Sequence, residues 1–107
     1  MPFYLIQASY TAPAVGAMIK NPQDRAAALR STMEKMGGKL HGFWFTFGEY
    51  DIVAIAETPD AVTAAAISMA IGSSGAVSAY RTTPLFTSAE ATEAMKKAAG
   101  VGYQAPK

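Results

Sequence analysis

The side chains best suited to catalysis or ligand binding lie between His41 and Asp51, in the stretch "HGFWFTFGEYD". This stretch holds the only histidine of the chain and two carboxylates two positions apart, Glu49 and Asp51. Histidine titrates near neutral pH, which suits it to abstract a proton from a substrate in a dry pocket. Two neighbouring acids can share acid–base work or form the rim of a ligand site. His41 is therefore the candidate base, and Glu49 and Asp51 are candidate ligand-binding or interface residues.

The same residues also suit a structural role, and both interpretations stay open at this point. Gly48 to Asp51 has the composition of a turn, because glycine tolerates unusual dihedral angles and an aspartate side chain accepts hydrogen bonds from backbone N–H groups. Two acids at this spacing are common in loops. A lone histidine beside aromatic residues on a strand is more often packed and hydrogen-bonded than catalytic.

Arg81 is the one charged residue in an otherwise neutral apolar segment. A charged side chain at such a place must reach solvent, pair with a carboxylate or bind an anion. We expect it to pair with Glu57 or Asp51. Other side chains could line a cavity or an interface, because each joins an apolar ring to a polar atom: Tyr4, Tyr10, Trp44 and Tyr80.

The composition removes several classes of site and partner. Cysteine is absent, which excludes disulfides and thiolate metal ligands, and one histidine without a metal-binding spacing predicts no metal and no cofactor. The net charge is +1 and the basic residues are scattered, so we expect neither nucleic acid nor a membrane surface as a partner. The aromatic run resembles the RNA-binding motif of RRM domains, but that motif belongs on the third strand and this run lies on the second.

The amino-terminal segment "MPFYLIQASY" lacks the basic region of a signal peptide. No apolar run approaches the roughly 20 residues that a membrane-spanning helix needs. We therefore expect a soluble cytoplasmic protein, with one domain over residues 1–100 and a tail over residues 101–107.

The periodicity of apolar residues predicts four strands, over residues 3–10, 39–47, 51–57 and 76–86, with Pro84 stopping the last. A short helix or turn begins at Thr11. A longer helix is capped by Asn21, has Pro22 as its first residue and ends at Gly37. Another follows Thr58-Pro59-Asp60 and ends at Gly72; it is apolar on nearly every side, so we expect it to be deeply packed. Thr87 and Glu90 form a capping-box pattern that opens a terminal helix.

This order of elements contains two split β-α-β units, which predicts a ferredoxin-like α+β fold with strand order 4-1-3-2 and an extra carboxyl-terminal helix. The first strand carries apolar residues at both parities, such as Leu5 and Ile6, so both of its faces should be covered. Only 16% of all residues are charged, which leaves few to cover a small surface. We expect a second copy of the chain to bury the sheet face that the helices leave open.

The register of the aromatic hairpin follows if Gly48 and Asp51 flank a two-residue turn. Phe47 would then oppose Ile52, and Phe45 would oppose Ala54. A bulge at Gly48 is the alternative, and it would shift these pairs.

The motif "GEYD", together with "YLIQASYT", "NPQDRAAALR", "GGKLHGFWF" and "GAVSAYRTTPLF", resembles the GYD family. That resemblance implies membership of the dimeric α/β-barrel superfamily, in which two ferredoxin-like sheets pack face to face. A looser resemblance, carried by "GEYDIVAIAE" and "GAVSAYRTTPLF", is to the effector-binding domains of Lrp/AsnC-type regulators. Turns of this kind lie there at subunit contacts where small effectors bind. The resemblance implies that Gly48, Tyr50 and Asp51 belong to an oligomer interface or a ligand rim.

Three functions remain in view. The first is a homo-oligomeric, cofactor-free protein that binds a small organic molecule. The second is a cofactor-independent monooxygenase, isomerase or cyclase acting on an aromatic or polyketide-like substrate, with His41 as base, Arg81 holding an anion, and Trp44 and Tyr4 lining an apolar cavity. The superfamily also includes heme-binding members, for which His41 would be the only histidine ligand. The third is a structural oligomer without a ligand.

Overall fold

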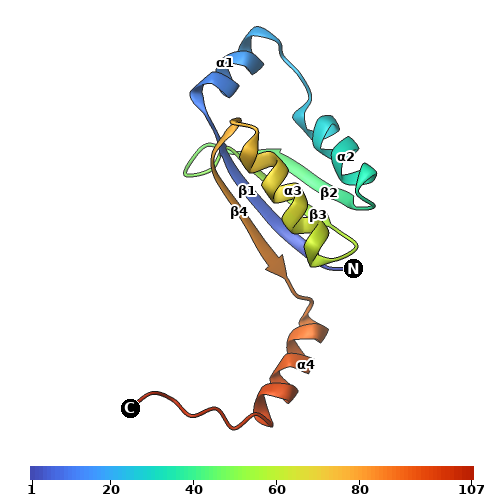
Figure 1. Cartoon of the computed structure of the whole chain (residues 1–107), viewed down its shortest axis with the longest axis vertical. Helices are drawn as coiled ribbons and strands as arrows, with labels where there is room; N and C mark the ends of the chain where they lie inside the picture. The colour runs from blue at the N-terminus through green and yellow to red at the C-terminus, as the bar shows by residue number, and fades with distance from the viewer.

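The computed structural model describes all 107 residues, and its centre is a four-stranded antiparallel sheet with the order β2-β3-β1-β4. Helices cover one face of this sheet and leave the other open (Figure 1). The elements in chain order are β1 Phe3–Tyr10, α1 Ala12–Lys20, α2 Arg25–Lys35, β2 Lys39–Phe45, β3 Ile52–Glu57, α3 Ala61–Ser73, β4 Val77–Leu85 and α4 Ser88–Ala99. The predicted ferredoxin-like α+β fold and its strand order are confirmed. None of the helices is long and apolar enough to span a membrane.

The buried core lies between the sheet and the inner sides of α2 and α3. Alternate residues of the central strands point into it, including Ile6 from β1 and Ala54 from β3. Met33 from α2 and Ile67 from α3 close it from the helical side. The strand residues Ala54 and Ala56 are small, so the space above them is filled by the larger side chains Met33 and Ile67 from the helices.

The helices begin where side chains satisfy their first backbone N–H groups. Thr11 caps α1, as the sequence predicted. The predicted start of α2 is wrong: its cap is Asp24, whose carboxylate accepts the N–H of Ala27 at 3.1 Å, and the helix begins at Arg25. Asn21 and Pro22 lie in the connection before it, because Asp24 caps the helix closer to its apolar stripe, which consists of Ala26, Leu29 and Met33.

The register of the aromatic hairpin differs from the predicted one by two residues. Phe45 opposes Ile52 and Phe43 opposes Ala54, so each aromatic residue keeps its predicted face but meets another partner. The loop is longer than a two-residue turn, because the N–H of Thr46 bonds with the carbonyl of Asp51 at 2.7 Å. A separate irregularity between Leu40 and Gly42 shifts the pairing of β2 with β3 by one more residue, so the bulge lies near the start of β2 and not at Gly48.

Two further expectations about β4 and α3 are wrong. Pro84 does not stop β4, because it pairs opposite Tyr4 on an edge strand, where the missing N–H can face outward. In α3 only Ala64 and Ile67 are buried, while Val62 and Met69 stay about three-quarters exposed. The apolar outer side of α3 therefore finds no cover within this chain.

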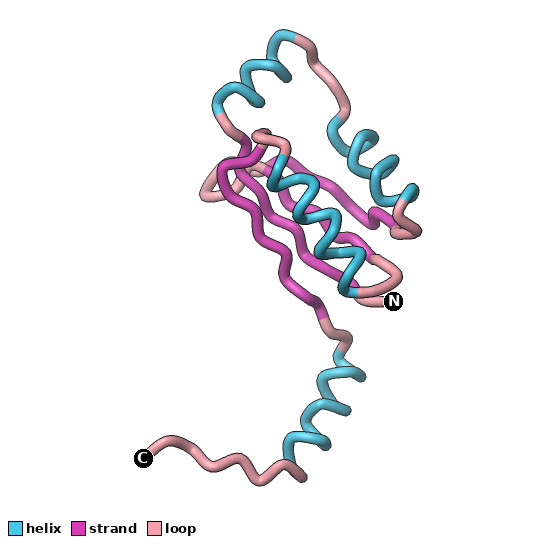
Figure 2. The backbone as a smooth tube through the Cα atoms, in the orientation of Figure 1, coloured by secondary structure: helices cyan, strands magenta, loops and turns pink.

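The last helix stands away from the rest of the molecule (Figure 2). No residue of α4 is buried, and the chain extends over 57 × 35 × 22 Å with a radius of gyration of 17.0 Å. A compact chain of this length would have a radius of gyration of about 13 Å. The folded body therefore ends with β4, and α4 forms an arm.

The capping box that opens α4 is present as the sequence predicted, and it makes the helix sensitive to acid. The backbone N–H of Thr87 donates to the Glu90 carboxylate at 2.9 Å, which lowers the pKa of Glu90 below its ordinary value of 4.5. A lowered pKa stabilises the folded helix above that ordinary value, and the gain is lost as the pH falls through the folded-state pKa. In wild type we expect the Cα chemical shifts of α4 to move toward coil values as the pH falls through the folded-state pKa of Glu90. In Glu90→Gln this titration should disappear.

Candidate functional site

The loop Gly48 to Asp51 is tied to the end of β1. The carboxylate of Asp51 accepts the backbone N–H of Tyr10 at 2.8 Å, and the backbone N–H of Asp51 donates to the carbonyl of Ala8 at 2.8 Å. The hydroxyl of Ser9 donates to the carbonyl of Glu49 at 2.8 Å. These bonds hold the end of β1 where its pairing with β4 becomes irregular, between Ser9 and Tyr10.

The turn interpretation of this loop is thus right for Asp51 and wrong for Gly48. The carboxylate of Asp51 accepts a backbone N–H, as expected of an aspartate in a turn. Gly48 is not among the glycines with positive φ, and a side chain there would meet no atom within 4 Å. The side chain of Glu49 is exposed and makes no hydrogen bond, and Tyr50 is half-buried.

His41 lies on the open face of the sheet. Its Nε2 is 2.8 Å from Oε1 of Glu57, and its ring stacks on Phe3 with 5.0 Å between centroids. The nearby Trp44 is 54% exposed, and its ring lies so close over Gly42 that a Cβ there would approach it to 2.2 Å. Gly42 thus lets the indole lie flat on the sheet.

Arg81 shares this face, because the pairing aligns it through Gln7 and Val53 with Trp44. Its side chain is exposed and forms no ion pair within the chain, so the expected pairing with Glu57 or Asp51 is wrong. Glu57 engages His41 instead.

These residues belong to a larger surface, which we call the open face. It joins His41, Trp44 and Arg81 to a set of half-buried strand residues that is mostly apolar: Phe3, Leu5, Gln7, Val53, Ile55 and Glu57. Nothing within the chain covers this surface. The open face therefore has the composition expected of a contact with another molecule.

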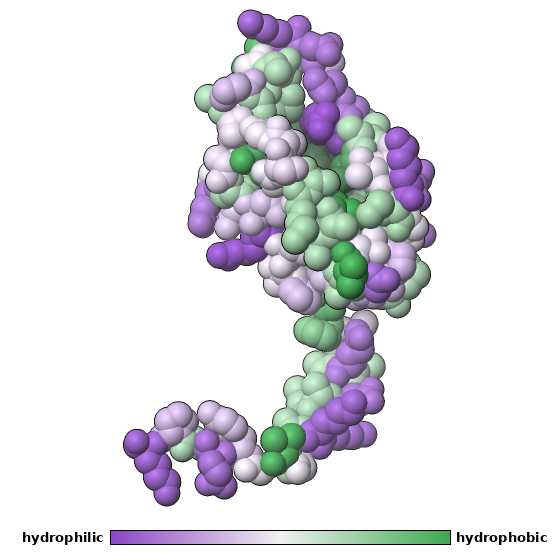
Figure 3. All heavy atoms as spheres, viewed as in Figure 1, coloured by the Kyte–Doolittle hydropathy of each residue, from purple (hydrophilic) through white to green (hydrophobic).

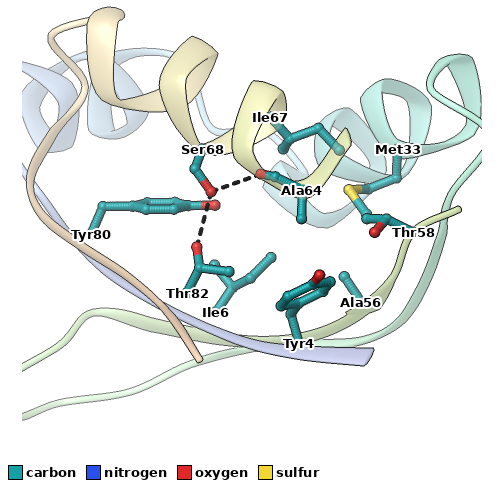
Figure 4. A pocket seen from close by; sticks show the side chains of 10 residues that line it. All are labelled: Tyr4, Ile6, Met33, Ala56, Thr58, Ala64, Ile67, Ser68, Tyr80 and Thr82. Carbon is teal, nitrogen blue, oxygen red and sulfur yellow. Dashed lines mark hydrogen bonds between the residues drawn. The ribbon is translucent and has the colours of Figure 1, made fainter. Parts of the chain in front are cut away.

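Tyr4 points to the opposite side of the sheet, into a small cavity of about 10 Å³ beneath α3 (Figure 4). At the other end of this cavity the hydroxyl of Tyr80 is buried and makes no hydrogen bond. The neighbouring hydroxyls of Ser68 and Thr82 bond with each other at 3.0 Å. Burial raises the pKa of Tyr80, although these two hydroxyls act in the opposite direction.

Tyr80 also lines a much larger cavity of about 290 Å³, between the sheet and the helices α2 and α3. Figure 3 looks onto this side and shows a hollow with apolar atoms at its floor. Most of the lining is apolar and comes from both helices and all four strands, including Leu29, Phe43, Ile52, Ile71 and Val77. The polar groups in the lining are few: Tyr10, Arg25, Thr32, Ser74 and Tyr80.

Tyr10 and Arg25 form a polar pair at this cavity. Burial raises the pKa of Tyr10, while the guanidinium of Arg25 beside its hydroxyl lowers it and the carboxylate of Asp51 raises it. Arg25 forms no ion pair and donates instead to the amide oxygen of Gln23 at 2.8 Å. A cation without a carboxylate partner at the edge of an apolar cavity suits an acidic ligand group.

Tyr10 and Asp51 also line a third cavity of about 410 Å³ under α1, which includes Val15, Ile19 and Phe47. The loop that carries the motif therefore borders a hollow, next to the 290 Å³ cavity and separated from it by Tyr10. No group of three His, Asp or Glu side chains lies close enough together to bind a metal ion.

The structure does not bring the predicted site residues together. His41, Trp44 and Arg81 share the open face, Tyr4 faces the helices, and Glu49 to Asp51 lie in the loop at the end of β1. Sequence reasoning missed Arg25 and Thr32, which lie beside the apolar stripe of α2 on the side facing the cavity. The spacing offered a signal, because Arg25 lies four residues before Leu29 and Thr32 three residues after it, which places all three on one side of the helix.

Comparison with known proteins identifies the family. A family model described as the GYD domain matches residues 4–95, which include the sheet except Phe3 and most of α4. No curated protein and no solved structure gives a significant match. The match covers most of the 107 residues, and the chain therefore belongs to the GYD domain family.

Proposed function

We propose that the protein is a homo-oligomer that binds a small, mostly apolar organic molecule carrying an acidic group. The observation that carries this proposal is the 290 Å³ cavity with its apolar lining and few polar groups. Known ligand pockets start at about 300 Å³ and have this type of lining. An apolar cavity of about 150 Å³ is enough for benzene, so a ligand with one substituted ring fits here.

The polar groups of the cavity suggest how such a ligand would lie. Arginine binds carboxylates through two parallel N–H donors, and Arg25 has no acidic partner in the chain. The hydroxyl of Tyr10 beside it offers a further donor. We place the acidic group of the ligand at this pair and its apolar body against Leu29, Ile71 and Val77.

The open face supports the oligomeric part of the proposal. A sheet face that stays in water normally carries polar residues, whereas here Phe3, Leu5 and Ile55 lie beside Trp44. A second copy of the chain offers the same apolar surface, so a twofold contact would cover both. This arrangement is the face-to-face packing that the dimeric α/β barrel requires.

The enzyme alternative finds less support in the geometry. His41 is engaged by Glu57 on the open face, while Tyr4 faces the opposite side of the sheet. The residues expected to abstract a proton and to line the substrate cavity therefore do not share one cavity.

The proposal can be tested by thermal melting with simple probes. Phenylacetate should raise the melting temperature of wild type more than the neutral phenylacetamide, since a ligand that binds the folded state stabilises it. Arg25→Gln should remove this preference for the acid. Arg81→Gln is the matched control, because it removes an arginine from the open face and should leave the preference intact. Equal responses of the two variants would contradict the proposed site.

The buried hydroxyl of Tyr80 gives an independent expectation. Without ligand, Tyr80→Phe should raise the free energy of unfolding by about 1 kcal/mol, because it removes a buried polar atom without a partner. Urea denaturation measures the change, and Tyr103→Phe in the exposed tail should leave the stability unchanged. A loss of stability in Tyr80→Phe would show that Ser68 or Thr82 bonds with the hydroxyl.

A further inference from the structure

The helix α4 is well defined by its own sequence and yet none of its residues is buried. It has a complete capping box at Thr87 and Glu90, two lysines in its last turn, and no buried residue. Helices shorter than about 12–15 residues are marginal in water without tertiary packing. A helix of 12 residues that leaves the body of the protein therefore needs a surface to pack against.

One side of α4 is suited to such packing. Successive turns place an apolar stripe along it: Ala91, Ala94, Met95 and Ala98. Met95 is 67% exposed, and Phe86 just before the helix is 74% exposed. Figure 3 shows apolar and hydrophilic atoms on opposite sides of this helix. The hydrophilic side carries Glu93 and Lys97, four residues apart.

We propose that α4 is an arm that packs on a second copy of this chain, beside that copy's open face. This inference rests on the homo-oligomer of the proposed function and adds the contact that completes it. Only Phe86 and Thr87 link α4 to β4, and the helix continues away from its own sheet (Figure 1). In a twofold assembly each copy would give one arm and receive one.

The arms would extend the contact made by the open face. Four strands about 4.8 Å apart, with six residues of about 3.3 Å paired between β1 and β3, give that face a flat outline of roughly 400 Å². A stable interface usually buries about 800 Å² of accessible surface on each partner. A reciprocal pair of arms adds the apolar side of α4 to the surface that the two sheets would bury.

Paramagnetic relaxation enhancement between two chains, measured by NMR, tests where the arm lies. The chain has no cysteine, so Thr92→Cys, an exposed position of α4 outside the apolar stripe, provides one attachment point for a nitroxide. A spin-labelled Thr92→Cys chain without isotope label is allowed to exchange with ¹⁵N-labelled wild type. We expect the amide signals of Val53 and Ile55 in the ¹⁵N chain to broaden. A label on Ser31→Cys, an exposed position of α2 in the helical layer, should leave them sharp.

A pair of charge variants tests the apolar stripe. Met95→Glu should weaken the dimer at least tenfold in sedimentation equilibrium, whereas Ala89→Glu, which adds the same charge outside the stripe, should leave it unchanged. The proposed arm contact would be wrong if the chain dimerised but the amide signals of Val53 and Ile55 stayed sharp. It would also be wrong if Met95→Glu and Ala89→Glu changed the dimer dissociation constant equally. Either result would leave the homo-oligomer intact. A monomer at all concentrations would overturn both, while phenylacetate binding by that monomer would preserve the proposed cavity.

Discussion

Replacing Trp44 with glutamate should separate the protein into monomers. The indole is 54% exposed and lies flat over Gly42 on the edge strand β2, in register with Val53 and Gln7 of the two central strands. Tryptophan is enriched among the interface residues that contribute 2 kcal/mol or more, which is roughly a 30-fold change in the dissociation constant. A buried, unpaired carboxylate would add its own desolvation cost. Sedimentation velocity over a dilution series measures the change.

The control for this substitution is Val62→Glu. Val62 is an apolar residue of α3 that is 78% exposed on the helical side of the sheet, so the variant adds the same charge away from the open face. We expect Val62→Glu to retain the oligomer. If Trp44→Glu retained it too, or if both variants lost it, the open face would not be the contact surface.

The second large effect is expected at Asp51. Asp51→Ala should lower the free energy of unfolding by about 1.5–3 kcal/mol, because the backbone N–H of Tyr10 loses a charged acceptor at 2.8 Å. Chemical denaturation measures the loss. Asp51→Asn should lose less, because its amide oxygen can still accept this bond.

Two neighbours in the same loop serve as controls. Gly48→Ala and Glu49→Ala should each stay within about 0.5 kcal/mol of wild type, because neither side chain meets a partner within the chain. If Asp51→Ala kept its stability but lost the oligomer or phenylacetate binding, Asp51 would act as a ligand or interface residue and not as a tie between the loop and β1.

Much of the fold was readable from the sequence because it depends on local signals. A short run rich in aromatic and aliphatic residues marks β1, and Thr11 and Thr87 mark the starts of α1 and α4. The start of α2 was misjudged because Asn21 and Asp24 are both good caps, and packing of the apolar stripe decides between them. The hairpin register was misjudged because the loop closed by Thr46 and Asp51 is longer than the two-residue turn that was assumed.

The candidate site was much less readable, since it depends on contacts between distant elements. Tyr10, Arg25 and Tyr80 come from β1, α2 and β4 and meet only after the helices pack on the sheet. Their separation in the sequence therefore does not predict that they line one cavity. The conspicuous run from His41 to Asp51 instead divides between the open face and a loop. For α3 the apolar composition predicted burial, but within one chain its outer side stays exposed.

The most direct test of the central claim is a methyl NMR titration of the wild-type protein with phenylacetate. Isoleucine, leucine and valine methyl groups report on each surface separately. We expect saturable shifts at Leu29, Ile71 and Val77, which line the 290 Å³ cavity, and none at the exposed Val62. Shifts confined to Val53 and Ile55 on the open face, or no saturable shift at any methyl group, would contradict the proposed binding site.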